Sequence, residues 1–130
     1  MFRPSQILER KSTLFSIVVA GVVGILAAPV ILPHIFHGFH IAHILLHVGG
    51  ITLATFLTIL SVMAYVRVHS KRLLITIFAF STFVMAEIVT LLDATWPSLY
   101  NLGDLALLEV GHLLMIMSLG LLAMGVFRND

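Results

Sequence analysis

Four apolar stretches occupy most of this 130-residue chain, and each, as a helix, would be about as long as a bilayer is thick. A helix needs about 20 residues to cross the hydrocarbon core of a membrane. Pro29 and Pro33 are expected to end the first stretch, because proline removes a backbone donor and discourages further helix. We therefore predict an all-α fold, an integral membrane bundle of four transmembrane helices that forms a single domain over residues 1–130. The expected spans are Leu14–Pro33, Ile41–Val66, Leu73–Leu92 and Leu105–Phe127.

The composition excludes a water-soluble globule. Hydrophobic residues make up 60% of the chain and charged residues only 10%, whereas a soluble domain carries about 25% charged residues. The absence of cysteine excludes a disulfide framework, a thiolate metal site and a cysteine nucleophile. A formal net charge of +1 gives no reason to expect nucleic acid as a partner. The lipid bilayer is the expected environment, and other membrane subunits are the expected protein partners.

The basic residues predict the orientation of the chain in the membrane. All seven Lys and Arg residues fall before the first span, between the second and third spans, or after the fourth: Arg3, Arg10, Lys11, Arg67, Lys71, Arg72 and Arg128. The other two connections, residues 34–40 and 93–104, contain none. The positive-inside rule then predicts a multi-pass protein of the cell membrane with both termini in the cytoplasm.

Polar side chains that are costly in a membrane gather near one surface. An ionisable residue within a span costs roughly 2.5–3.5 kcal/mol or more at mid-bilayer, so each is a candidate for function. Five of them are expected within about two turns of the outer surface, or roughly 3–12 Å deep at 1.5 Å per residue. They come from three different spans: His43, His47, Glu87, Glu109 and His112.

The spacing of these residues favours a shared metal site. His40, His43 and His47 form one stripe of the second span, and Glu109 and His112 share a face of the fourth. Imidazole is a common ligand of zinc, copper and iron, and a carboxylate can ligate the ion or orient an imidazole.

We predict His43, His47 and His112 as ligands, with Glu87 and Glu109 as further ligands or as partners of the histidines. His37 and His40 are expected at the mouth, where they could pass a metal or a proton inward. Only one Glu-x-x-His motif is present, which disfavours a di-iron oxidase, and we expect copper or zinc rather than iron.

Three other interpretations of the same residues stay open. Buried polar groups also hold membrane helices together by hydrogen bonds, which would make this a purely structural packing subunit. A haem b could be bound by a histidine of the second span and His112, with Gly49, Gly50 and Gly111 making room for the macrocycle. A metal transporter or sensor is weaker, because spans three and four are nearly free of polar groups in their cytoplasmic halves.

The chain resembles small archaeal polytopic membrane proteins of unassigned function over His43–Arg128. The shared features are a histidine-bearing helix, the basic hairpin Arg67–Arg72, an acidic residue late in the next helix at Glu87, and a final helix that opens with Leu108–His112. It also looks like the small extra subunits of archaeal copper membrane monooxygenases of the ammonia and methane type. It has no signature motif of their catalytic subunits, and no catalytic residue is assigned.

That resemblance implies an accessory role. We expect a small subunit of a larger membrane oxidoreductase that is not catalytic alone and carries a metal site near the outer face.

Overall fold

The computed structural model describes residues 10–34, 38–96, 101–102 and 105–128 of the chain. Four of its helical segments are long and apolar enough to cross a membrane: Lys11–Ile31, Ile41–Val68, Lys71–Thr95 and Leu107–Phe127. These bounds lie within a few residues of the predicted spans. The all-α, multi-pass membrane fold is therefore confirmed.

The elements follow one another with short connections. The long helices are α2 (Lys11–Leu26), α4 (Gly38–Val68), α5 (Lys71–Thr95) and α6 (Leu107–Phe127). A π-helix, η1 (Ala27–Ile31), and a short helix, α3 (Leu32–His34), continue α2. Two-residue strands β1 (Asn101–Leu102) and β2 (Leu105–Ala106) pair antiparallel immediately before α6.

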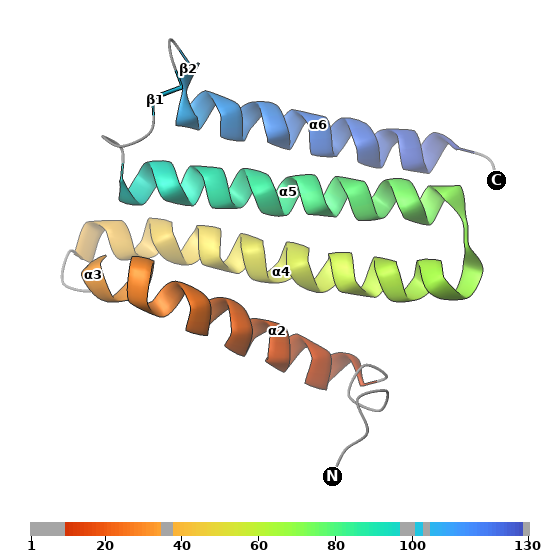
Figure 1. Ribbon diagram of the computed structural model, residues 1–130, viewed down its shortest axis with the longest axis horizontal. Coiled ribbons are helices and arrows are strands. Elements are labelled where there is room, and N and C mark those ends of the chain that lie inside the picture. The colour runs from red at the N-terminus through yellow and green to blue at the C-terminus, as the bar shows by residue number, and fades with distance from the viewer. Residues whose placement is uncertain (1–9, 35–37, 97–100, 103–104, 129–130) are drawn as a thin grey trace.

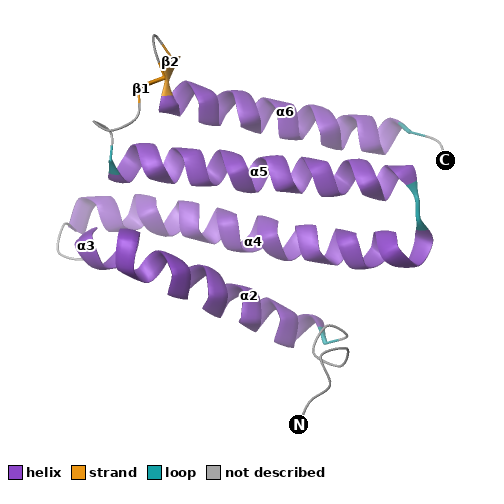
Figure 2. Ribbon diagram, viewed as in Figure 1, coloured by secondary structure: helices purple, strands orange, loops and turns teal. Residues whose placement is uncertain are grey.

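The long helices lie side by side in the order α6, α5, α4, α2 (Figure 1; Figure 2). Helix α5 packs along both α4 and α6, and α2 contacts α4 over a shorter length. No other pair of these four helices makes more than slight contact in the part of the chain that the structure describes. Among the long helices as described, α6 consequently packs mainly against α5, and most of its surface is left to the surroundings.

The regular α-helix of the first span ends at Leu26, before Pro29, and the helical path continues through η1 and α3 to His34, next to the predicted limit at Pro33. A proline lacks the N–H for the helical hydrogen bond, and its ring clashes with the carbonyl four residues earlier. The chain accommodates Pro29 by widening into the π-helix η1, from which α3 continues as far as His34. Single π-turns of this kind are a known way of absorbing such a defect within a helix.

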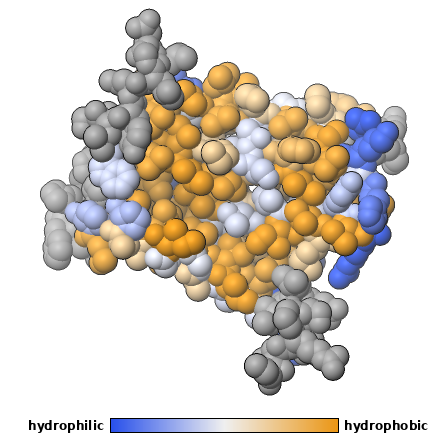
Figure 3. Space-filling view, in the orientation of Figure 1, coloured by the Kyte–Doolittle hydropathy of each residue, from blue (hydrophilic) through white to orange (hydrophobic). Residues whose placement is uncertain are grey.

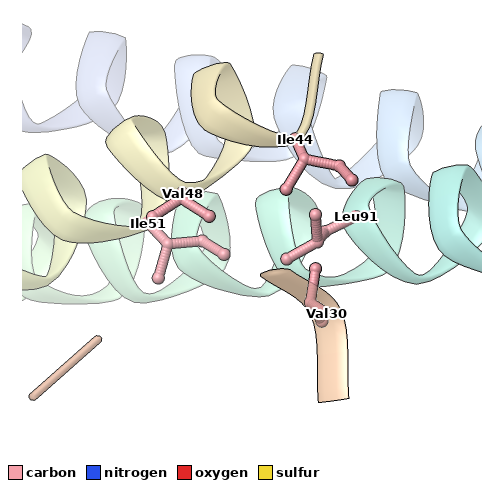
Figure 4. Packing of buried hydrophobic residues seen from close by; sticks show 5 residues of the cluster. All are labelled: Val30, Ile44, Val48, Ile51 and Leu91. Carbon is pink, nitrogen blue, oxygen red and sulfur yellow. The ribbon is translucent and has the colours of Figure 1, made fainter. Parts of the chain in front are cut away.

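A small apolar core lies where η1 meets α4 and α5. It contains Val30 of η1, Leu91 of α5, and Ile44, Val48 and Ile51 of α4, all at most 5% exposed. In Figure 4 the side chains of Val30 and Ile44 lie on either side of Leu91. This cluster fixes the C-terminal end of the first span against α4 and α5.

The opposite end of the bundle carries the basic residues that the structure describes. Figure 3 shows a strongly hydrophilic surface at the end where α4 joins α5, and a mainly hydrophobic surface along the middle. Within this end, Arg72 donates from Nε to the carbonyl of Gly125 at 3.0 Å and from Nη2 to the carbonyl of Arg128 at 2.7 Å. Its guanidinium therefore caps the C-terminus of α6, where the helix dipole favours a cation.

The α5–α6 contact depends on small residues. Ser118 is only 1% exposed and donates from Oγ to the carbonyl of Ala79 at 2.8 Å. One end of the same interface has Gly111 directly against Thr90. Glycine, alanine and serine let membrane helices approach closely enough for such contacts.

Replacing Gly111 with alanine is expected to force α5 and α6 apart. The added Cβ would lie 2.5 Å from Cγ2 of Thr90, whose hydroxyl is itself bonded to the carbonyl of Ala86. We expect the free energy of unfolding to fall by about 1–3 kcal/mol, measured by unfolding in detergent micelles followed by circular dichroism.

The matched control is Gly120→Ala on the same helix, where an added Cβ would meet nothing within 4 Å. Alanine is the better helix former, so this variant is expected to be unchanged or slightly more stable. An equal loss of stability in both variants would contradict the importance of the Gly111 contact.

Candidate functional site

A histidine and a carboxylate meet between α4 and α5. His47 Nδ1 lies 2.7 Å from Glu87 Oε2, and the two side chains are only 15% and 9% exposed. When Glu87 is ionised its carboxylate can only accept, and the N–H of His47 Nδ1 is then the donor. This distance is typical of a charge-assisted hydrogen bond. The bond fixes the orientation of the imidazole and leaves Nε2 as its second functional atom.

A second imidazole faces that atom. His43 lies one turn earlier on α4, and its Nε2 is 3.2 Å from His47 Nε2. The two rings are nearly perpendicular, at 85°, with centroids 4.6 Å apart. His43 is exposed, so this end of the pair is open to the surroundings. We call His43, His47 and Glu87 the His–Glu cluster.

Two uncharged residues support the His–Glu cluster. Gly50 of α4 lies directly against the carboxylate, and a Cβ at this position would be 2.8 Å from Glu87 Cδ. Thr90 Oγ1 lies 3.3 Å from His47 Nδ1 and donates to the carbonyl of Ala86 at 2.9 Å. From the sequence, Gly50 was expected only to make space, and Thr90 was not predicted to contribute. A signal was present, because His47 and Gly50, like Glu87 and Thr90, are three residues apart and share a helix face.

The two predicted site residues of α6 lie elsewhere. The buried residues of α6 are Leu107, Gly111, Ser118 and Gly125, whereas Glu109 and His112 are both exposed. Within the described ranges, neither side chain makes a hydrogen bond or an ion pair. The structure therefore brings together three of the five predicted residues and leaves Glu109 and His112 apart from them.

The predicted entry residues lie outside what can be described. His37 falls among the residues that the structure does not describe, and of His40 only the backbone, in α4, is described. Among the described residues, no group of three or more His, Asp or Glu side chains is arranged to hold a metal ion. The haem alternative would need His112 and a histidine of α4, but α5 lies between α6 and α4.

The geometry of the His–Glu cluster suits two kinds of chemistry. If one Nε2 keeps its proton, the two histidines share a hydrogen bond. Together with Glu87 they then form a short hydrogen-bonded chain along which a proton can pass. If both Nε2 atoms are deprotonated, they can bind one ion. Two nitrogens at 2.0–2.1 Å from a tetrahedral ion are about 3.3–3.4 Å apart, close to the observed 3.2 Å.

The chain matches no family model, and no curated protein or solved structure is similar to it. A functional proposal for this chain therefore rests on the arrangement of its own side chains in the His–Glu cluster.

Replacing Gly50 with alanine is expected to separate His47 from Glu87. The new Cβ would lie 3.0 Å from both carboxylate oxygens, so the carboxylate or the whole of α5 must shift. The strongly deshielded Nδ1 proton expected for His47 in nuclear magnetic resonance spectra should then move upfield or vanish. Gly49→Ala is the control, because nothing lies within 4 Å of its added Cβ. An unchanged resonance in Gly50→Ala would contradict the close packing.

Proposed function

We propose that this protein is a small integral membrane subunit of a larger oxidoreductase complex and that it holds a transition metal, copper or zinc, at the His–Glu cluster. The observation that carries the proposal is the pair of Nε2 atoms of His43 and His47, 3.2 Å apart, with Glu87 bonded to the far side of His47. A histidine that binds a metal almost always donates its other N–H to a carboxylate, a carbonyl or water.

The incompleteness of the ligand set supports a subunit rather than an independent enzyme. Two histidines leave two positions of a tetrahedral ion for water or for residues of another protein. The exposed position of His43 at this open end is where such ligands would arrive. A copper membrane monooxygenase of the ammonia and methane type is the kind of complex that the resemblance of the sequence suggests.

Helix α6 offers the surface for a partner subunit. Glu109 and His112 lie on its exposed side, and ionisable groups that face lipid within a span are costly. Hydrogen bonds from a neighbouring membrane protein would offset that cost. Exposed large apolar residues such as Leu113 and Ile116 provide contact area on the same helix.

The orientation follows from the basic end of the bundle. Lys11, Arg67, Lys71, Arg72 and Arg128 come at the start of α2, at the α4–α5 connection and at the end of α6. The positive-inside rule assigns this end to the cytoplasm of a cell membrane. The His–Glu cluster, toward the opposite end, would then face the outer half of the bilayer.

Metal analysis of the purified protein tests the proposal directly. After chelation and reloading with Cu(I) or Zn²⁺, the wild type should retain about one ion per chain. His43→Leu and His47→Leu should lose it, and Glu87→Gln should bind about 10–100-fold more weakly. His112→Leu should leave the metal content unchanged, because His112 lies apart from the His–Glu cluster; a loss of the ion would contradict the proposed ligand set.

The control is His69→Asn, at the cytoplasmic end. His69 has a φ of 53°, a conformation that asparagine tolerates better than most residues. This variant should bind as the wild type does. If the wild type binds neither copper nor zinc near stoichiometry, the metal proposal fails.

A double variant of α6 tests the partner surface. Glu109→Leu with His112→Leu should reduce co-purification of other membrane proteins in mild detergent. The metal content should stay as in the wild type, because the His–Glu cluster is unchanged. Mass spectrometry of the purified complex measures the change. Co-purification that is unaffected would contradict the assignment of this face to a partner.

A further inference from the structure

Thr90 of α5 contacts both of the helices that pack against α5. The residue is only 5% exposed. Its Oγ1 lies 3.3 Å from Nδ1 of His47 on α4. Its Cγ2 lies against Gly111 of α6, where an added Cβ would be 2.5 Å away. A single buried side chain therefore joins α6 to the His–Glu cluster.

The two branches of Thr90 cannot move independently. Both are attached to the same Cβ, so a rotation about χ1 moves Oγ1 and Cγ2 together. Oγ1 donates to the carbonyl of Ala86 at 2.9 Å and lies 3.1 Å from the carbonyl of Glu87, which favours one rotamer. A displacement of Cγ2 must consequently move Oγ1 as well, either by rotation of the side chain or by a shift of α5.

The hydroxyl oxygen of Thr90 is a second acceptor at His47. Its hydrogen is directed to Ala86, so a lone pair of Oγ1 can face the imidazole. When Nδ1 carries a proton, its acceptors are Oε2 of Glu87, 2.7 Å away, and Oγ1 of Thr90, 3.3 Å away. These two acceptors set the plane of the imidazole. That plane in turn sets the position of Nε2, which lies 3.2 Å from Nε2 of His43.

Gly111 connects this arrangement to the exposed face of α6. It is buried against α5, whereas Glu109 and His112, which come before and after it in the sequence, are exposed. Because Gly111 has no side chain, the backbone of α6 itself meets Thr90. A protein that contacts Glu109 and His112 would therefore bear on the turn of α6 that packs against Thr90.

We propose that Thr90 is a positioning residue that couples the packing of α6 to the orientation of His47. A shift of α6 against α5 moves Cγ2, Oγ1 follows, and the imidazole of His47 tilts relative to that of His43. A partner on α6 thereby regulates the His–Glu cluster. The effect on metal affinity rests on the proposed function, whereas the effect on the imidazole requires no metal.

A double-variant cycle between Gly111 and Thr90 tests the coupling. The readouts are the Nδ1 proton resonance of His47 in metal-free protein in detergent micelles, and the affinity for Cu(I) or Zn²⁺. Gly111→Ala should shift the resonance and weaken metal binding about tenfold, because its Cβ displaces Cγ2 of Thr90. Thr90→Ser lacks Cγ2 and retains Oγ1, so it should resemble the wild type. Combining the two should restore both readouts, because the clash is removed and the hydroxyl is kept.

Thr90→Val separates the hydroxyl from the packing. Valine keeps a methyl group against Gly111 but removes the acceptor at His47, so the resonance should shift and metal binding should weaken about tenfold. The control is Thr82→Val, which removes a hydroxyl that likewise donates to the carbonyl four residues earlier on α5, that of Phe78. This variant should leave both readouts unchanged.

The outcomes separate the coupling from the metal site. An unchanged His47 resonance in Gly111→Ala and Thr90→Val would overturn the coupling, as would equal effects of Thr90→Val and Thr82→Val. A resonance that responds as expected in a protein that binds no metal would support the coupling and overturn the proposed function. Stoichiometric metal binding with an unresponsive resonance would do the reverse.

Discussion

The hydrogen bond between His47 and Glu87 is the interaction on which the rest of the proposed site depends. A carboxylate buried between two membrane helices is costly unless donors surround it, and His47 supplies one at 2.7 Å. Gly50 makes that contact possible, because any larger residue would occupy the space of the carboxylate. The hydrogen bond between His47 and Glu87 therefore depends on the close approach of α4 to α5, which Gly50 allows, and the bond in turn holds the two helices together.

The arrangement of the helices sets what this pair can reach. Because α5 lies between α4 and α6, Glu87 meets α4 on one side of its helix, where Oε2 lies 2.7 Å from His47 Nδ1. The other ring nitrogen of His47 lies 3.2 Å from His43. In the proposed site, a change at Glu87 would therefore alter the orientation of His47 and, through it, the pair of Nε2 atoms.

Helix α6 has a different role from the one that its residues suggest. Its small residues Gly111 and Ser118 pack against α5 and fix its position. That packing turns Glu109 and His112 outward rather than toward the His–Glu cluster. Ionisable side chains that face lipid within a span are costly, and this cost is the reason for proposing a neighbouring protein at this face of α6.

The sequence by itself determined the number of spans, their approximate limits, the clustering of the basic residues and the position of each polar residue along its span. These properties can be predicted because they depend only on local quantities, the hydrophobicity of each residue and the helical rise of 1.5 Å per residue. They were sufficient to predict that His43, His47 and Glu87 lie at one level. The widening at Pro29 was not predicted, because a π-turn depends on how the following residues pack.

Only the tertiary structure decided which polar residues meet. Residues at one depth come together only if their helices are neighbours and are rotated to face each other, and both conditions depend on packing between distant segments. Gly50 allows Glu87 to reach His47, whereas Gly111 and Ser118 hold α6 in a rotation that separates His112 from them. Spacing along one helix fixes relative positions on that helix, but no local rule fixes its rotation against the next.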